Sequence, residues 1–153
     1  MKIRWSRLIL CILIVYGVGF AGSIFSSAGI SSDWYRSVKP SITPPDYIFP
    51  IVWNVLFFLI AISLYLAWMK SDRKEKTKIT AVFGINFILN ILWSFLYFRI
   101  QSPFFAFIEI IFLWLSVAAM IYTTYKIDKA SSYLLIPYIL WVSFAIVLNY
   151  LSI

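Results

Sequence analysis

The chain has 153 residues, of which 63% are hydrophobic, 20% aromatic and only 12% charged. A water-soluble domain of this length could not hide so much apolar surface in its interior, so the composition excludes a soluble globular protein. The formal net charge of +7 reflects 13 Lys and Arg residues against six Asp and Glu residues, and the cations lie before the first apolar run or in the connectors between runs. Cations placed in this way are signals of membrane topology and do not indicate a nucleic-acid-binding face.

Five apolar runs are each long enough to cross a bilayer, which takes about 20 helical residues. In chain order they cover residues 8–25, 48–69, 79–98, 103–125 and 133–153. The runs are continuous rather than alternating, and no backbone group can stay unpaired in lipid, so we predict that all five are α-helices. The predicted fold is an all-α integral membrane bundle of five transmembrane helices, forming a single domain over residues 1–153 in the cell membrane.

The connectors on the two sides of these spans differ in charge. Ten cations fall on the side of the N-terminus and three on the other side, so we expect the N-terminus in the cytoplasm and the C-terminus outside. The ten are Lys2, Arg4, Arg7, Lys70, Arg73, Lys74, Lys76, Lys78, Lys126 and Lys129. The basic start and first apolar run also resemble a signal peptide. That run has 18 residues, which is long for a signal core, and we interpret it as a retained span.

Histidine is absent from the sequence, and Cys11 is the only cysteine. The absence of histidine removes His-based metal sites, the usual axial haem ligand and the commonest general base. A lone cysteine inside the first span cannot form a disulfide within the chain. We therefore expect neither a metal site nor a resident cofactor.

The first connector, residues 26–47, is too long and too apolar to be simple filler. Trp34 and Tyr35 argue against disorder, and Pro40, Pro44 and Pro45 stiffen the path into the second span. We predict a structured lid over the outer end of the bundle, with one helical turn over residues 33–38. The alternative is an interfacial anchor, with the two aromatic rings among lipid headgroups. By contrast, we predict that residues 70–78 form a solvated charged turn without a site.

The third span carries a polar stripe at membrane depth. Asn86, Asn90, Ser94 and Tyr97 follow one face of a helix, with Trp93 beside them. An amide without a partner in hydrocarbon costs several kcal/mol, so we expect this face to point inward.

Matching stripes occur in the other spans. They are Trp53, Phe57 and Ala61 in the second, Tyr138, Trp141, Ala145 and Asn149 in the fifth, and the small residues Gly19, Gly22, Ser23 and Ser26 in the first. Large aromatic side chains facing small ones, with a few amides between them, can line a cavity for a flat apolar ligand. The alternative is that the amides merely join helices and the small residues only allow close packing.

Glu109 is the only acidic or basic residue inside a span. A carboxylate at that depth must pair, reach water or be neutral. Two interpretations are open: a proton or ion pathway, or a carboxyl group that is hydrogen-bonded near the outer interface, with Arg99 or Gln101 close by.

Ordered motifs in four segments closely resemble the translocator protein family, also called tryptophan-rich sensory proteins or peripheral-type benzodiazepine receptors, and in particular its bacterial members. They are Trp34-Tyr35 with Lys39-Pro40-Ser41 and Pro44-Pro45, then Pro50-x-Val52-Trp53, then Asn90-x-x-Trp93, and last Pro137-Tyr138-x-x-Trp141-x-x-Phe144-Ala145-x-x-Leu148-Asn149. The resemblance covers essentially the whole chain.

This resemblance implies a five-helix bundle, often dimeric, with a pocket near the first loop. Family members bind porphyrins such as protoporphyrin IX and benzodiazepine-site ligands, and animal members also bind cholesterol. The positions that match the family pocket are Ser23, Tyr35, Trp53, Asn90, Trp141, Ala145 and Leu148, with Asn86 where animal members carry Gln. From the stripes we add Phe57, Trp93 and Tyr138 as candidate ligand-binding residues.

In three places the chain departs from the family pattern. The C-terminal sterol motif ends in a basic residue in animal members, whereas here Tyr150 is followed only by residues 151–153, which contain none. The Gly-x-x-x-Gly-like pair of the third helix, which packs the dimer in the family, corresponds here to Ala81 and Ile85. A fourth-helix tryptophan of animal members aligns with Phe105. These positions bear on sterol binding, dimer contacts and ligand shape.

Three functions are compatible with these residues. The first is a receptor or transport-type protein that binds porphyrins, in which Trp53 and Trp141 contact the ring and Asn90 donates a hydrogen bond, with a role in tetrapyrrole handling or stress response. The second is a light-dependent enzyme that degrades porphyrins, with the same two tryptophans passing electrons. The third is a small channel or proton-coupled carrier that uses Glu109.

Overall fold

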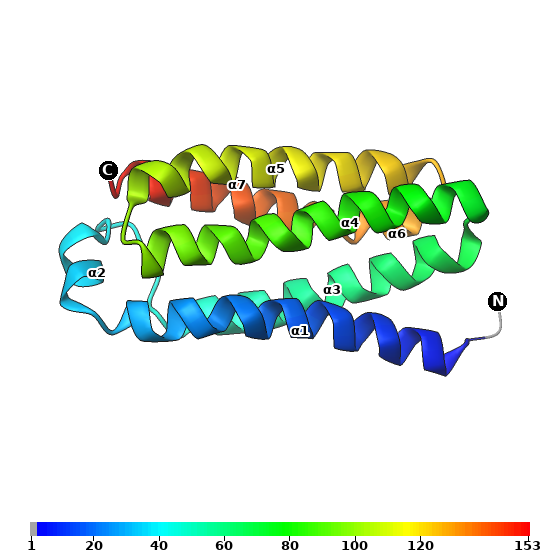
Figure 1. The fold of residues 1–153 in the computed structure, drawn as a ribbon, viewed down its shortest axis with the longest axis horizontal. Coiled ribbons are helices and arrows are strands. Elements are labelled where there is room, and N and C mark those ends of the chain that lie inside the picture. Colours follow the sequence, from blue (N-terminus) through cyan, green and yellow to red (C-terminus); the bar gives the residue numbers. More distant parts are fainter. Residues whose placement is uncertain (1–2) are drawn as a thin grey trace.

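A computed structural model describes residues 3–153, and over this range the chain consists of helices with short links. Five helical segments are long and apolar enough to cross a membrane, which confirms the predicted all-α bundle (Figure 1). In chain order the elements are α1 (Trp5–Ile30), α2 (Asp33–Val38), α3 (Ile48–Lys70), α4 (Arg73–Ser94), the π-helical turn η1 (Phe95–Arg99), α5 (Pro103–Tyr125), α6 (Lys129–Tyr133) and α7 (Ile136–Tyr150). Lys2, one of the cations used to predict orientation, lies outside the described residues.

The spans run side by side along the long axis of the molecule, with α2 at one end and the N-terminus at the other (Figure 1). Helix α5 packs against α4 and α7, and α1 packs against α3 and α4. Their facing sides form one apolar core of buried side chains, which includes Val15, Ile60, Phe83, Val117 and Val142. Many other large apolar side chains face outward, as expected for helices that are solvated by lipid.

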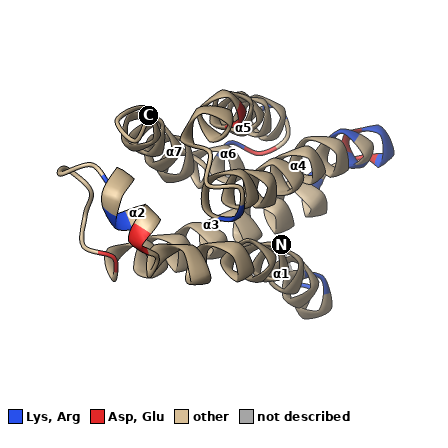
Figure 2. Cartoon of the chain, turned by 60° about the vertical axis from the view of Figure 1, so that its left-hand side comes forward, with Lys and Arg blue, Asp and Glu red and all other residues tan. Residues whose placement is uncertain are grey.

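Charged residues gather toward the ends of the spans (Figure 2). At the end opposite α2, Lys70 at the end of α3 pairs with Asp128, the N-cap of α6, with 2.8 Å between Nζ and Oδ1. Nearby, the ammonium group of Lys76 lies 5.9 Å from the ring centroid of Trp68. This distribution leaves apolar side chains along most of each span, where the hydrocarbon core would lie.

Helix α1 ends five residues beyond the predicted limit of residue 25, so that boundary was wrong. Serines near this boundary fit a helix because their hydroxyl groups bond within it. Ser23 Oγ donates to the carbonyl oxygen of Phe20 at 2.7 Å, and Ser26 Oγ donates to that of Ser23 at 3.5 Å. The connector is therefore residues 31–47, and α2 occupies the predicted residues 33–38.

The predicted charged turn over residues 70–78 is also wrong, because most of it is the first part of α4. Asp72 caps the helix: its carboxylate accepts from the backbone N–H of Glu75 at 2.7 Å, and the Glu75 carboxylate accepts from the N–H of Asp72 at 2.9 Å. This reciprocal capping box satisfies two backbone donors at the helix start. Only Ser71 and Asp72 separate α3 from α4.

The third span ends in the π-helical turn η1, in which the N–H of Ile100 donates to the carbonyl oxygen of Phe95 at 3.0 Å. Gln101 then adopts a left-handed backbone conformation, with φ of 56°, which costs a non-glycine residue about 1–2 kcal/mol. Ser102 caps α5, and Pro103 occupies its first turn. The chain therefore reverses sharply between the third and fourth spans, at the end where α2 lies.

The fifth span is interrupted, whereas the sequence predicted one helix over residues 133–153. Helix α6 ends at Tyr133, and α7 begins at Ile136. Pro137 explains the break, because it has no N–H to donate to the carbonyl group four residues earlier. Leu135, between the two helices, is completely buried and holds the break inside the bundle.

A reciprocal serine pair joins α3 to α6 beside this break. Ser63 Oγ lies 2.8 Å from the carbonyl oxygen of Ser131, and Ser131 Oγ lies 2.7 Å from that of Ser63. Both side chains are completely buried. Because each hydroxyl group has a partner across the interface, the two helices can approach closely without leaving a polar atom unpaired.

Glu109 lies on the buried face of α5, with only 6% of its surface exposed. Neither carboxyl oxygen has a hydrogen-bond partner among the described residues. The expected hydrogen bond near Arg99 or Gln101 is therefore not present. A buried polar group without a partner costs free energy, so the Glu109 carboxyl group lowers the stability of the bundle.

Replacing Asp72 with alanine should lower the stability of the protein by about 1 kcal/mol, because it removes the N-cap of α4. The measurement is thermal unfolding in detergent micelles. Asp33→Ala is the matched control, since Asp33 is exposed and pairs only with the exposed Arg36. Equal unfolding temperatures for the two variants would contradict the role of the cap.

Replacing Glu109 with leucine should raise the free energy of unfolding by roughly 1–3 kcal/mol, because two buried oxygen atoms without partners are removed. Glu109→Gln keeps the shape and the polar atoms, and it should gain much less. Thermal unfolding of both variants in the same micelles checks this. A lower unfolding temperature for Glu109→Leu would show that the carboxyl group makes a stabilising interaction.

Candidate functional site

A cavity of about 540 Å³ lies in the half of the bundle nearest α2. Its walls are formed by residues of α1, α3, α4 with η1, α5 and α7, and by the connector between α1 and α3. The volume falls within the range of small-molecule sites, which are typically about 300–1,000 Å³. All five spans therefore meet around one internal space.

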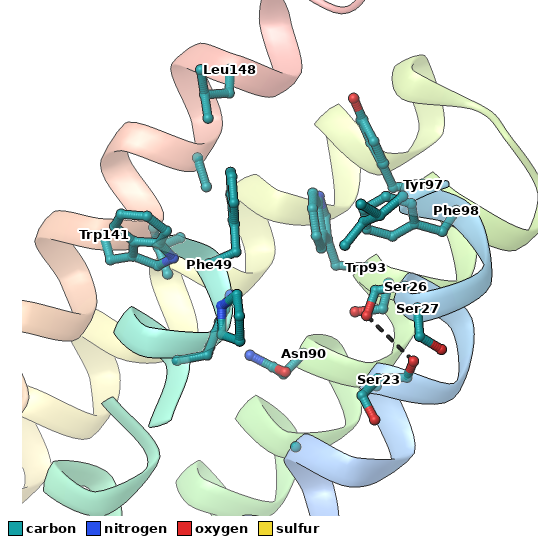
Figure 3. A pocket seen from close by; sticks show the side chains of 18 of the residues that line it. Ser23, Ser26, Ser27, Phe49, Asn90, Trp93, Tyr97, Phe98, Trp141 and Leu148 are labelled. Atoms are coloured by element: carbon teal, nitrogen blue, oxygen red, sulfur yellow. Dashed lines mark hydrogen bonds between the residues drawn. The ribbon is translucent and has the colours of Figure 1, made fainter. Parts of the chain in front are cut away.

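The structure brings together nine of the eleven ligand-binding residues expected from the sequence. They are Ser23, Tyr35, Trp53, Phe57, Asn90, Trp93, Trp141, Ala145 and Leu148. Figure 3 shows Asn90 between the α1 serines and Trp141, with Trp93 on the opposite side from Trp141. The other two, Asn86 and Tyr138, are buried and do not belong to the lining.

Aromatic rings form most of the cavity wall. Trp53 stacks on Phe57, with 5.1 Å between ring centroids and an angle of 30° between the planes. Trp93 stacks in the same way on Tyr97, at 5.1 Å and 20°. Trp141 is oriented by Phe49, which meets it edge-on at 5.7 Å. Stacked and edge-on pairs fix the ring orientations, so the wall is largely rigid and presents flat apolar surfaces.

Asn86 and Tyr138 lie behind the wall and hold Asn90 in place. Asn90 Nδ2 donates to Tyr138 Oη at 3.1 Å, and Tyr138 Oη donates to Asn86 Oδ1 at 3.2 Å. Asn86 Nδ2 then donates to Ser116 Oγ at 2.9 Å. This series of hydrogen bonds joins α4, α5 and α7. The polar stripe of α4 therefore serves packing as well as the cavity.

The same series of hydrogen bonds determines what Asn90 offers to the cavity. We expect its amide group to donate a hydrogen bond to a ligand, and one of its two N–H groups bonds to Tyr138, which leaves the other. No hydrogen bond to its carbonyl oxygen is formed by residues 3–153. Asn90 can therefore offer both an acceptor and one N–H donor to a ligand.

A second set of hydrogen bonds orients the wall near η1. Trp93 Nε1 donates to Asn149 Oδ1 at 2.9 Å, and Asn149 Nδ2 donates to the carbonyl oxygen of Pro103 at 2.8 Å. The hydroxyl groups of Tyr97 and Ser152 are 2.9 Å apart. These bonds tie α7 to both neighbouring spans at the level of the cavity.

Small residues on α1 make room for the aromatic side chains. A methyl group on Gly19 would overlap the ring of Phe57, and one on Gly29 would overlap that of Phe98. Between these glycines, Ser23, with Ser26 and Ser27 beside it, lines the cavity (Figure 3). Because the Ser23 hydroxyl group donates to its own helix, its oxygen remains free to accept a hydrogen bond.

The connector contributes Tyr35, Pro40, Thr43 and Asp46 to the cavity lining. Trp34 meets the ring of Tyr97 edge-on at 5.6 Å, and the buried Tyr35 packs against Phe98 at 5.7 Å. Helix α2 begins where Ser32 Oγ accepts from the N–H of Tyr35 at 3.1 Å. These contacts place the two aromatic side chains against Tyr97 and Phe98 of η1.

Burial raises the pKa of Tyr35 to about 12, and the nearby Tyr97 and Asp46 act in the same direction. Because this value is above the ordinary pKa of tyrosine, the phenol is neutral throughout the physiological range. Tyr35 therefore brings a neutral, mainly apolar ring to the cavity, although it lies in the exposed connector.

The lining also contains residues that the sequence patterns did not single out. Thr43 and Asp46 come from the connector, and Phe49 lies one helical turn before Trp53. The spacing of Phe49 could have indicated its position, since residues four apart share a helix face. The path of the connector depends on tertiary contacts, so no local signal identifies Thr43 or Asp46.

The site is suited to binding and offers little acid-base chemistry. Within residues 3–153, Asp46 is the only charged residue of the lining. Among the described residues no group of three or more Cys, His, Asp or Glu side chains could hold a metal ion. What the walls offer is flat apolar surface with a few hydrogen-bond acceptors, chiefly Asn90 and the α1 serines.

Comparisons with known proteins place the whole chain in one family. Residues 11–152 match the model of the TspO/MBR family. The chain is 38% identical over 146 residues to the tryptophan-rich protein TspO of Chlorobaculum tepidum, covering 94% of this chain and 91% of that protein. It is 40% identical over 145 residues to the tryptophan-rich protein TspO of Archaeoglobus fulgidus, covering 94% and 93%.

A more distant relative is the translocator protein of Ovis aries, which is 28% identical over 135 residues, covering 86% of this chain and 79% of that protein. The family match extends through every membrane-spanning segment that surrounds the cavity. The chain is thus a multi-pass integral membrane protein that belongs to the TspO/MBR family.

Proposed function

We propose that this protein binds porphyrins in the cavity beneath the connector and acts as a receptor or transport-type protein in tetrapyrrole handling or stress response. The observation that carries the proposal is the pairing of rigid aromatic walls with a fixed hydrogen-bond acceptor. Trp53 and Trp141 present ring surfaces to a flat ligand, and Asn90 offers its carbonyl oxygen. A free-base porphyrin matches both features, since it is flat, aromatic and carries pyrrole N–H groups.

The shape and chemistry of the site also fit synthetic benzodiazepine-site ligands, which are compact and mostly apolar. Leu148 and Ala145 give one part of the α7 wall an apolar, uncharged surface, and the serines of α1 line another part of the cavity. The resemblance of the sequence motifs to the peripheral-type benzodiazepine receptors implies the same ligand classes. We regard these compounds as ligands of the same cavity.

Replacing Trp141 with alanine should weaken the binding of protoporphyrin IX about tenfold, because it removes a central aromatic surface. Asn90→Ala should weaken binding about three- to tenfold through the lost acceptor. The measurement is a titration of the purified protein in micelles, followed by the porphyrin Soret absorbance, so that removing a tryptophan does not alter the signal itself.

The matched control is Trp5→Ala, since Trp5 is 65% exposed and lies at the start of α1, far from the lining. This variant should bind as the unchanged protein does. If Trp141→Ala and Asn90→Ala also bind with unchanged affinity while remaining folded, the cavity is not the porphyrin site.

A further inference from the structure

The cavity lacks a positive charge of its own. Its lining contains no Lys or Arg among the described residues, and Asp46 is its only charged member. A porphyrin with acidic side arms would bring carboxylates to this site. Moving a carboxylate into an apolar interior without a partner is very costly, so the acid groups must stay at the rim or find a cation there.

Lys39 is the cation at that rim. Its ammonium nitrogen lies 2.5 Å from Asp46 Oδ1 and 5.5 Å from the centroid of the Tyr35 ring. Both partners line the cavity, as does Pro40, the next residue in the chain. The ion pair joins the two ends of the loop that follows α2 and so holds the ammonium group against two residues of the cavity lining.

The other cations near this end are directed elsewhere. Arg36 pairs with Asp33 at 3.1 Å, and neither residue lines the cavity. Arg99 borders a separate small hollow between α1 and η1, together with Gln101. Lys39 is therefore the cation best placed to meet a ligand that occupies the cavity.

We propose that Lys39 recognises the carboxylate of a ligand at the mouth of the cavity, in exchange for Asp46. The ligand class is a flat aromatic compound with an acidic side arm, oriented with its acid group toward the connector. This inference rests on the proposed porphyrin function and adds an orientation and a charge requirement to it.

The exchange is physically reasonable because the two partners are unequally exposed. The side chain of Asp46 is 50% exposed, so it can turn to water when displaced, whereas that of Lys39 is only 25% exposed. An ammonium group has three donors and can also hold both carboxylates during the exchange. Asp46 itself repels an incoming carboxylate, so the two residues have opposite effects on acidic ligands.

The test compares two ligands with the same macrocycle, protoporphyrin IX with its two acid groups and the dimethyl ester, in which both acids are uncharged methyl esters. Each is titrated into the unchanged protein, Lys39→Gln and Asp46→Asn in uncharged detergent at low salt. For the diacid, Lys39→Gln should weaken binding about fivefold, the upper size of a partly exposed ion pair. Asp46→Asn should strengthen it by about two- to fivefold.

The dimethyl ester should bind all three proteins within about twofold, since it has no carboxylate to pair. Both substitutions break the same ion pair, so loosening of the connector would shift them in the same direction. Arg36→Gln, which removes a nearby cation that does not line the cavity, should leave the binding of both ligands nearly unchanged.

Three results would overturn the role of Lys39: weaker diacid binding in both variants, equal effects on diacid and ester, or no effect on either. The proposed function is judged separately by the unchanged protein. If it binds the ester but the variants do not differ, porphyrin binding stands and the carboxylate site fails. If it binds neither ligand, both proposals fail.

Discussion

Polar side chains buried between the spans need partners within the protein, because the surrounding hydrocarbon offers none. The polar stripe of α4 meets this demand with bonds to α5 and α7, through Ser116, Tyr138 and Asn149. These bonds fix how the three helices face one another. They also determine which atoms remain for a ligand, since Asn90 uses one N–H group for Tyr138 and keeps its other N–H group and its carbonyl oxygen. Packing and recognition therefore depend on the same hydrogen bonds.

The space for a ligand arises because the two ends of the bundle are packed differently. Near α6, Ser63 and Ser131 bring the helices into direct contact, and their side chains are completely buried. Near α2, the helices are separated by bulky rings such as Trp53 and Trp93, which stack on Phe57 and Tyr97, and the glycines of α1 make room for Phe57 and Phe98. Rings braced by stacking cannot collapse into the gap, so the cavity persists as part of the fold.

Much of this arrangement could be predicted from sequence, because lipid imposes simple rules of length and hydropathy. The five spans, the turn of α2 and the shared lining by residues such as Trp53, Asn90 and Trp141 all follow from local patterns or from family motifs. The errors occurred where local signals compete. Helix α1 continues through serines that bond to their own helix, beyond the predicted end. A capping box starts α4 in the stretch predicted as a charged turn, and Pro137 interrupts the last span. The position of Tyr138 behind the wall depends on tertiary packing, which no local pattern encodes.

The break between α6 and α7 has a consequence for how a ligand could travel. Leu135 is fully buried there, with Met120 and Ala67 likewise buried in the same core. The bundle is thus tightly packed at the end near α6, while the cavity lies in the half nearest α2. Such an arrangement favours entry and exit by the same route, and does not favour conduction from one face of the membrane to the other. A protein built in this way is suited to holding a molecule and handing it on at the surface where it arrived.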